Sequence, residues 1–291
     1  MLNLTTVAPL LQRTGVYGPV TATLDWCELN HQFSPYIAEM ANTFSNLFTV
    51  LLALAGYREA CREKLPTRYG TGYLGIALVG IGSFFFHATL LFEAQLADEL
   101  PMIYVGSMSL FLLFDTKSGF SIDTSRSRAL MVALALFDVL FTWSYMVSRN
   151  PIYHQLVFAG LVIGTAARVA YILNNASPSG PDASTQSTPC VTSTTLASPS
   201  STSQNANETR PVYKPIPPKK KSTIAAFFST GAGLFALGFL VWNLDNIFCG
   251  ALTKWKVGLG WPMAFLLEGH SWWHVLTGLG TYYMFIGIQC E

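Results

Sequence analysis

Apolar stretches long enough to cross a membrane recur along this chain, and they constrain its fold more than any other feature. A helix needs about 20 predominantly apolar residues to span a hydrocarbon core of about 30 Å. The sequence contains seven such stretches, at residues 36–57, 71–91, 96–115, 128–147, 152–173, 223–244 and 262–287. Lipid offers no partner to a free backbone group, so each stretch must be helical. We therefore predict an all-α membrane protein, folded as a seven-transmembrane helix bundle.

One break in composition interrupts this pattern. Residues 174–222 are rich in Ser, Thr, Pro and Asn and end in the basic run KPIPPKKKS. A segment with so little to bury is expected to be a disordered loop. We find no repeat and no second folded domain. The predicted organisation is a single domain, 1–291, with an N-terminal segment at 1–35, five helices in 36–173, the loop at 174–222 and two helices in 223–291.

The basic residues are distributed unevenly between the two sets of connecting segments. With seven spans, the set formed by 58–69, 116–128 and 174–222 carries twelve Lys and Arg residues, whereas the other set, with the N-terminus, carries four. Cytosolic loops of membrane proteins carry the excess of positive charge. The N-terminus is therefore predicted to lie in the lumen or outside, and the C-terminus and the loop 174–222 in the cytosol.

The cysteines fit this orientation. Cys27 and Cys249 fall on the lumenal side, where disulfides persist, and Cys61, Cys190 and Cys290 fall on the reducing side. We predict a disulfide between Cys27 and Cys249. The alternative is two unpaired cysteines that share one side of the membrane.

Two histidines stand four residues apart near the end of the chain, in EGHSWWHVLTG. On a helix His270 and His274 project from one face, about 6 Å apart along the axis, which suits two ligands of one metal ion. A hydrolytic zinc site needs a third protein ligand and an open position. His87 is the histidine that lies inside a span at the same lumenal depth, although a buried histidine is often only a packing group.

Two further polar residues accompany His87 in GSFFFHATLLFEAQLADEL. Asp98 could accept a proton from water at a metal, and Ser83, one turn before His87, could donate to a developing oxyanion. Each has a structural alternative, since Ser83 could bond to its own helix and Asp98 could be an N-cap.

A second cluster of oxygen-bearing residues precedes the first span, in TLDWCELNHQFSPYIAEM. Such ligands suit a hard cation such as calcium, with a backbone carbonyl as a further donor. The candidates are Asp25, the Trp26 carbonyl, Glu28, Asn30 and Glu39. The same residue types also occur in ordinary loops.

Five motifs occur in order along the chain. They are DWCELN, a glutamate nine residues later, SFFFHATL with an aspartate eleven residues after its histidine, WNLDNIFC, and EGHSWWH. This pattern resembles the alkaline ceramidases, seven-span intramembrane zinc amidases that share a superfamily with the adiponectin receptors. The resemblance covers the chain outside 174–222, a loop longer than the family core needs.

The resemblance implies a role for each matching residue. His87, His270 and His274 match the zinc ligands. Asp98 matches the catalytic aspartate and Ser83 the serine near the metal. The calcium site is matched by Asp25, Trp26 through its backbone oxygen, Glu28, Asn30 and Glu39. Cys27 and Cys249 match the lumenal disulfide.

The implied reaction is hydrolysis of the N-acyl bond of ceramide, dihydroceramide or phytoceramide to a sphingoid base and a free fatty acid. Zn²⁺ would be catalytic and Ca²⁺ structural or regulatory. The expected partner is the membrane lipid substrate, with no nucleic acid and no protein partner, in the endoplasmic reticulum or Golgi membrane. One alternative is a related seven-span hydrolase or receptor for another lipid amide or ester. The other is a receptor or transporter whose histidines relay protons.

Overall fold

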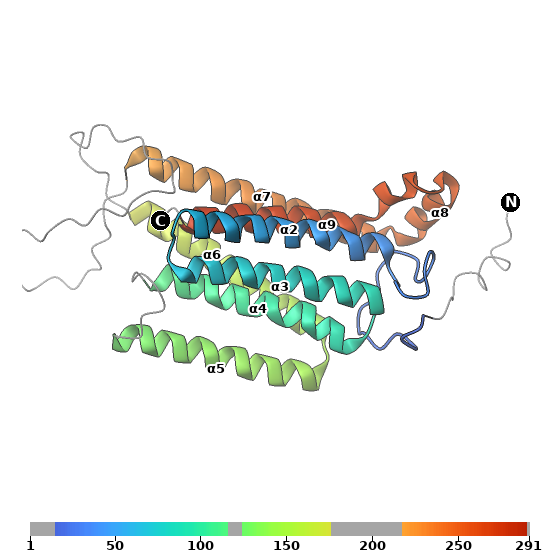
Figure 1. Cartoon of the computed structure of the whole chain (residues 1–291), viewed down its shortest axis with the longest axis horizontal. Helices are drawn as coiled ribbons and strands as arrows, with labels where there is room; N and C mark the ends of the chain where they lie inside the picture. The colour runs from blue at the N-terminus through green and yellow to red at the C-terminus, as the bar shows by residue number, and fades with distance from the viewer. Residues whose placement is uncertain (1–14, 116–123, 176–216, 290–291) are drawn as a thin grey trace, which may run out of the picture.

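The structure is a computed structural model that describes residues 15–115, 124–175 and 217–289. Its elements are α2 (Met40–Arg62), α3 (Thr67–Thr89), α4 (Phe92–Phe114), α5 (Ser125–Ser148), α6 (Pro151–Asn175), α7 (Pro218–Ile247), α8 (Cys249–Leu259), the 3₁₀-helix η2 (Met263–Leu267) and α9 (Gly269–Gln289). In these ranges there is no strand, only two isolated β-bridges before α2. The long helices lie along a common direction (Figure 1), and the all-α prediction is confirmed.

Five helices, α3 to α7, are long and apolar enough to cross a membrane. The helices α2 and α9 have 23 and 21 residues but are not among them. Both carry polar side chains on their buried faces, for example Asn42 and Asn46 on α2, and His270 and His274 on α9. These side chains lower the hydropathy of the two helices although they are buried inside the bundle. For α2 and α9, membrane crossing stays a prediction.

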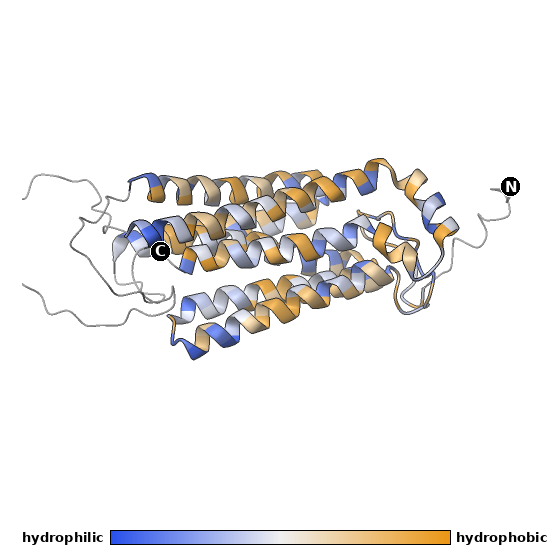
Figure 2. Cartoon of the chain, turned by 90° about the horizontal axis from the view of Figure 1, so that it is seen from above, coloured by the Kyte–Doolittle hydropathy of each residue, from blue (hydrophilic) through white to orange (hydrophobic). Residues whose placement is uncertain are grey.

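The segment after α7 differs from the expectation. The apolar stretch at 262–287 predicts one continuous helix, but α9 begins only at Gly269, after the separate turn of η2. The Asp245 carboxylate accepts from the Gly269 N–H at 3.1 Å, which fixes the start of the new helix. In addition, α8 forms where a connecting loop is predicted, and it turns away from the long axis at the end of the bundle (Figure 1). Apolar residues run along the long helices of the bundle (Figure 2).

The predicted loop at 174–222 is helical at both of its ends. Asn175 closes α6, and α7 begins at Pro218, so the basic run at 219–221 forms the first turn of that helix. Proline suits this position because its missing N–H is one of the donors that a helix start leaves unpaired. Residues 176–216 of the predicted loop lie outside the described residues.

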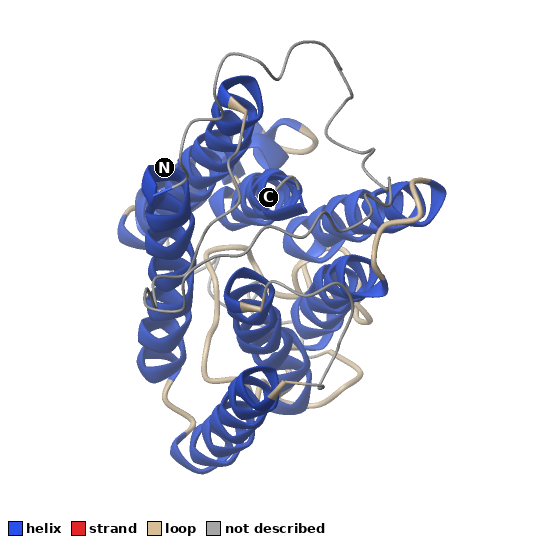
Figure 3. Cartoon of the chain, turned by 90° about the vertical axis from the view of Figure 1, so that its left-hand side faces the viewer, coloured by secondary structure: helices blue, strands red, loops and turns tan. Residues whose placement is uncertain are grey.

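The last helix, α9, packs against both α2 and α7, and in the view along the bundle its C-terminal end lies among the other helices (Figure 3). Glycines bring the backbones together. A Cβ on Gly231 of α7 would lie 2.5 Å from the Gly280 carbonyl oxygen, and a Cβ on Gly278 would lie 2.4 Å from Thr49 Oγ1 of α2. Small residues allow this approach between membrane helices. These contacts fix the position of α9, and with it the depth of its histidines.

Candidate metal centre

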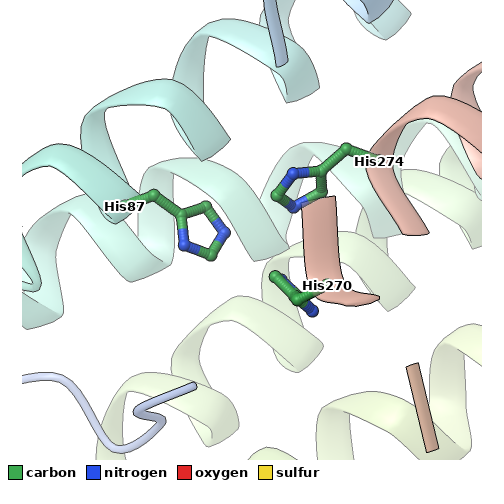
Figure 4. A group of neighbouring side chains, drawn as sticks. All are labelled: His87, His270 and His274. Atoms are coloured by element: carbon green, nitrogen blue, oxygen red, sulfur yellow. The ribbon is translucent and has the colours of Figure 1, made fainter. Parts of the chain in front are cut away.

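The structure brings the three predicted histidines together at one end of the bundle. His87 lies near the end of α3, and His270 and His274 lie in the first two turns of α9. One ligand nitrogen of each lies within 4.8 Å of the others, and all three side chains are buried. Figure 4 shows the rings grouped about a common point, although they come from two helices far apart in the sequence. This is the geometry that a three-histidine metal site requires.

Hydrogen bonds orient two of these rings from behind. His87 Nδ1 donates to Glu39 Oε2, and His274 Nδ1 lies 2.8 Å from Ser45 Oγ. The Ser45 hydroxyl itself donates to the Asn42 carbonyl at 2.9 Å, and Asn46 Nδ2 lies 3.3 Å from the same His274 nitrogen. Because Nδ1 of both rings already has these partners, Nε2 of His87 and of His274 is the nitrogen left for the centre of the group. A carboxylate behind a ligating histidine is the usual outer-shell arrangement at zinc.

Two imidazole nitrogens of the group are buried without a hydrogen-bond partner among the described residues, His87 Nε2 and His270 Nδ1. A buried polar atom left unpaired costs about 1–3 kcal/mol, and native structures hold few of them. A metal ion coordinated by the ring nitrogens would satisfy such atoms. The donor set, three neutral imidazoles, is one that suits zinc.

Asp98 and Ser83 lie together at the end of the bundle that holds this group. The Ser83 hydroxyl donates to the Asp98 carboxylate. The contact depends on Gly82, because a Cβ there would lie 1.9 Å from the Ala97 carbonyl oxygen of α4. A two-residue turn at Leu90 joins α3 to α4, so His87 and Asp98 occupy the same end of the bundle. Asp98 is in the second turn of α4, whose N-cap is Leu91, so the N-cap alternative for Asp98 is wrong.

The predicted calcium ligands gather in the segment before α2, in partly different roles. Asn30 Nδ2 donates to both Asp25 oxygens, at 3.1 and 3.3 Å. Glu28 instead accepts from the backbone of α2, from Ala41 N at 2.7 Å and Asn42 N at 2.8 Å, so it caps that helix. Among the described residues, the carboxylates of this set do not form a three-ligand group as tight as that of the histidines.

Two oxygens of this set are nevertheless buried without a hydrogen-bond partner in the described chain, Asn30 Oδ1 and Glu39 Oε1. Burial, with the Glu39 and Glu268 carboxylates nearby, raises the pKa of Glu28 to about 8. Carboxylates crowded in this way repel one another, and a bound cation would relieve the repulsion. The Trp26 backbone N–H donates to Glu39, which holds the Trp26 backbone beside this set. The residues fit a hard cation of the calcium type.

The predicted disulfide between Cys27 and Cys249 is present and joins the N-terminal segment to the start of α8. Beside it, Lys256 of α8 donates to Glu268 at 2.6 Å and to the Cys27 carbonyl at 3.3 Å, with both charged side chains buried. Burial raises the pKa of Glu268 to about 7, and the Lys256 ammonium acts in the opposite direction. These contacts tie α8 and the N-terminal segment to the residue that precedes α9.

Sequence reasoning missed the residues that hold the histidines. Glu39 and His87 are 48 residues apart, so no pattern within one helix predicts the hydrogen bond between their side chains. Ser45 and Asn46, in contrast, belong to a polar stripe that recurs at helical spacing in an apolar stretch, from Asn42 to Thr49. That stripe lies on the face of α2 that packs against α9, and its helical spacing was sufficient to predict which face of α2 is buried.

Comparison with known proteins shows which family the chain belongs to. A family model described as Ceramidase matches residues 18–291. The chain belongs to the ceramidase family. Among curated ceramidases, alkaline ceramidase 3 of Mus musculus is 32% identical over 276 residues, which cover 95% of this chain and 86% of that protein. Alkaline ceramidase YPC1 of Saccharomyces cerevisiae is 30% identical over 284 residues, or 94% and 78%. The alkaline ceramidase of Arabidopsis thaliana is 26% identical over 266 residues, or 91% and 82%.

Proposed function

We propose that this chain is a zinc-dependent intramembrane amidase that hydrolyses the N-acyl bond of ceramides, releasing a sphingoid base and a free fatty acid. The observation that carries the proposal is the convergence of His87, His270 and His274, with unpartnered nitrogens, beside the Ser83–Asp98 pair. Three neutral ligands leave a fourth position open for water or substrate. Membership of the ceramidase family supports the choice of ceramide as the substrate.

Each residue of the site has a chemical role in this proposal. Zinc held by the histidines would supply a Lewis acid that polarises the amide carbonyl and activates water. Asp98 accepts the proton of the attacking water and later delivers it to the leaving nitrogen of the sphingoid base. Ser83 positions Asp98 by donating its one hydrogen to the carboxylate; once Asp98 has taken a proton, that hydroxyl can turn and donate to the carbonyl oxygen as negative charge develops there. Glu39 fixes the orientation and tautomer of His87.

We also propose that all seven long helices cross the membrane, with the metal centre at the lumenal end and the C-terminus in the cytosol. The disulfide supports this orientation, because it lies at the same end as the histidines and disulfides persist in oxidising compartments. The uneven distribution of basic residues supports it independently. Such a protein would reside in the endoplasmic reticulum or Golgi membrane and take its substrate from the surrounding lipid.

The direct test of this function is turnover by the purified full chain in liposomes. We expect a sphingoid base and a fatty acid to be released, in equal amounts, from at least one of ceramide, dihydroceramide and phytoceramide. Mass spectrometry of the product lipids measures both. If the protein with its metal bound releases no sphingoid base from any of the three, but cleaves another lipid amide or ester, the site is that of a different membrane hydrolase.

We propose that calcium binds the segment before α2, through oxygens of Asp25, Glu28, Asn30 and Glu39 and the Trp26 carbonyl. The unpartnered buried oxygens of Asn30 and Glu39 support this assignment. Glu39 belongs to both constellations, because Oε2 accepts from His87 while Oε1 has no hydrogen-bond partner in the described chain. A cation there would hold the N-terminal segment over the end of the bundle where the histidines lie.

Removing calcium should lower both thermal stability and turnover. In the wild type, a chelator selective for calcium over zinc is expected to reduce the melting temperature and the rate, and added calcium should restore both. In Asp25→Asn, half-recovery should need about tenfold more calcium, because a charged ligand is lost. Glu93→Gln is the matched control, since Glu93 is an exposed carboxylate in the first turn of α4. Identical calcium titrations for the two variants would exclude Asp25 from the site.

A further inference from the structure

Two tryptophans beside the metal centre carry buried hydrogen-bond donors that nothing in the described chain accepts. Trp26 Nε1 and Trp242 Nε1 are both buried, and neither has a hydrogen-bond partner there. An indole N–H only donates, so each of these groups calls for an acceptor oxygen. Buried donors without an acceptor are rare, and two in contact with one another need a common explanation.

Their position relates both donors to the histidines. The Trp26 ring stacks on the His270 ring, with centroids 4.0 Å apart and an angle of 13° between the planes. The Trp242 ring meets that of Trp26 edge-on at 5.8 Å. Trp26 belongs to the segment before α2, and Trp242 lies in the last two turns of α7. The two indoles therefore border the metal centre on the side where the bundle ends.

We propose that Trp26 and Trp242 form a donor pair that binds the two hydroxyl oxygens of the sphingoid part of ceramide. This inference rests on the proposed function. Apart from the amide carbonyl, which the reaction places at the metal, the oxygens of ceramide are the hydroxyls on C1 and C3. Both hydroxyls lie at the head of the molecule, whereas the alkyl chains offer no acceptor. Donors at the end of the bundle meet the head of a lipid whose chains extend into the membrane.

The chemistry of the indole fits this task. Its flat apolar face packs along a lipid backbone, while its N–H makes one directed hydrogen bond. A site built around buried donors also discriminates, because a substrate that lacks the hydroxyl leaves a donor unpaired. The wild type should therefore prefer ceramide to its 1-deoxy and 3-deoxy analogues, with the difference seen mainly in KM.

The chain offers a matched control. Trp272 is also an indole at the start of α9, but its Nε1 donates to the Leu266 carbonyl at 3.2 Å and its side chain is exposed. Trp→Phe at positions 26, 242 and 272 removes the same N–H in each case and keeps an aromatic ring. At position 26 the backbone carbonyl assigned to calcium is unchanged.

The experiment compares kcat/KM for ceramide, 1-deoxyceramide and 3-deoxyceramide, using the full chain in liposomes. We expect the wild type to prefer ceramide to each analogue by about tenfold or more, as expected for one lost hydrogen bond. Trp26→Phe and Trp242→Phe should each lose the preference against one analogue, and Trp272→Phe should keep both. The preference is a ratio within one preparation, so it does not depend on the fraction of a variant that folds.

Two results overturn the donor pair while leaving the proposed function intact. One is a wild type that hydrolyses ceramide and both analogues equally well. The other is a set of preferences that the Trp26→Phe and Trp242→Phe variants leave unchanged. A wild type that releases no sphingoid base from ceramide, dihydroceramide or phytoceramide contradicts the proposed function itself, and the donor pair with it. Zinc content measured in every preparation shows that the metal centre is present in each comparison.

Discussion

The His270→Gln variant is expected to lose both its zinc and its ceramide turnover. Two of the three ligands, His87 and His274, would remain, and two neutral nitrogens do not hold zinc in an open tetrahedral site. Loss of an outer-shell partner alone costs about 10- to 100-fold in affinity, so loss of a ligand should exceed that range. Elemental analysis of the purified protein gives the zinc content, and release of sphingoid base gives the activity.

His154→Gln is the control for this experiment. His154 is also buried at membrane depth, but its Nε2 lies 3.0 Å from the Glu99 carbonyl and it takes no part in the three-histidine group. A glutamine amide can still donate to that carbonyl, so zinc should stay bound. If both variants retain as much zinc as the wild type, His270 is not a ligand. Zinc lost from both would show that the measurement reports the fold.

Asp98→Asn is expected to separate chemistry from metal binding. The amide keeps the shape of the carboxylate but cannot take a proton from water, so turnover should fall by about 10²–10⁴, the usual contribution of a general base. Zinc content should match that of the wild type, because Asp98 contacts Ser83 and is not part of the histidine group. Single-turnover rates in liposomes, taken with zinc content, provide the measurement.

The neighbouring carboxylate provides the matched control. Glu99 follows Asp98 in α4 but points into a separate network, where it accepts from Tyr145 and from Gln95 at 3.1 Å. Glu99→Gln should retain turnover within about tenfold, with some loss of stability, because Tyr145 keeps an acceptor. If the two variants lose activity equally, or if Asp98→Asn also loses zinc, then Asp98 acts through structure and not as the base.

Much of this fold could be predicted from patterns that operate over one helix. Apolar stretches located the long helices, and the i, i+4 spacing placed His270 and His274 on one face. The disulfide followed from a different argument, the side of the membrane on which Cys27 and Cys249 are predicted to fall. Each of these inferences needs only local periodicity or a count of charges. That is why they could be made without any knowledge of tertiary contacts.

Other features depend on contacts that no local pattern contains. The sequence predicts Lys256 to be an ordinary charged residue in a connecting loop, yet its side chain is buried (5% exposed) and forms an ion pair with Glu268. Hydropathy also cannot distinguish one span from a span preceded by a 3₁₀ turn, so it placed the start of α9 too early. The substrate is a third case, because His87, His270 and His274 specify a metal and not a lipid. Family membership supplies that choice.

The distance in sequence between α2 and α9 has a consequence for how the protein is made. The polar face of α2, from Asn42 to Thr49, is buried against α9 in the finished molecule. About two hundred residues separate these helices, which at ribosomal speeds of roughly 5–20 residues per second means roughly 10–40 s of synthesis. During that time α9 is not yet made, so the polar face of α2 must be in contact with water, lipid or an assembly factor. A chain that ends before Gly269 lacks the surface that buries this polar face.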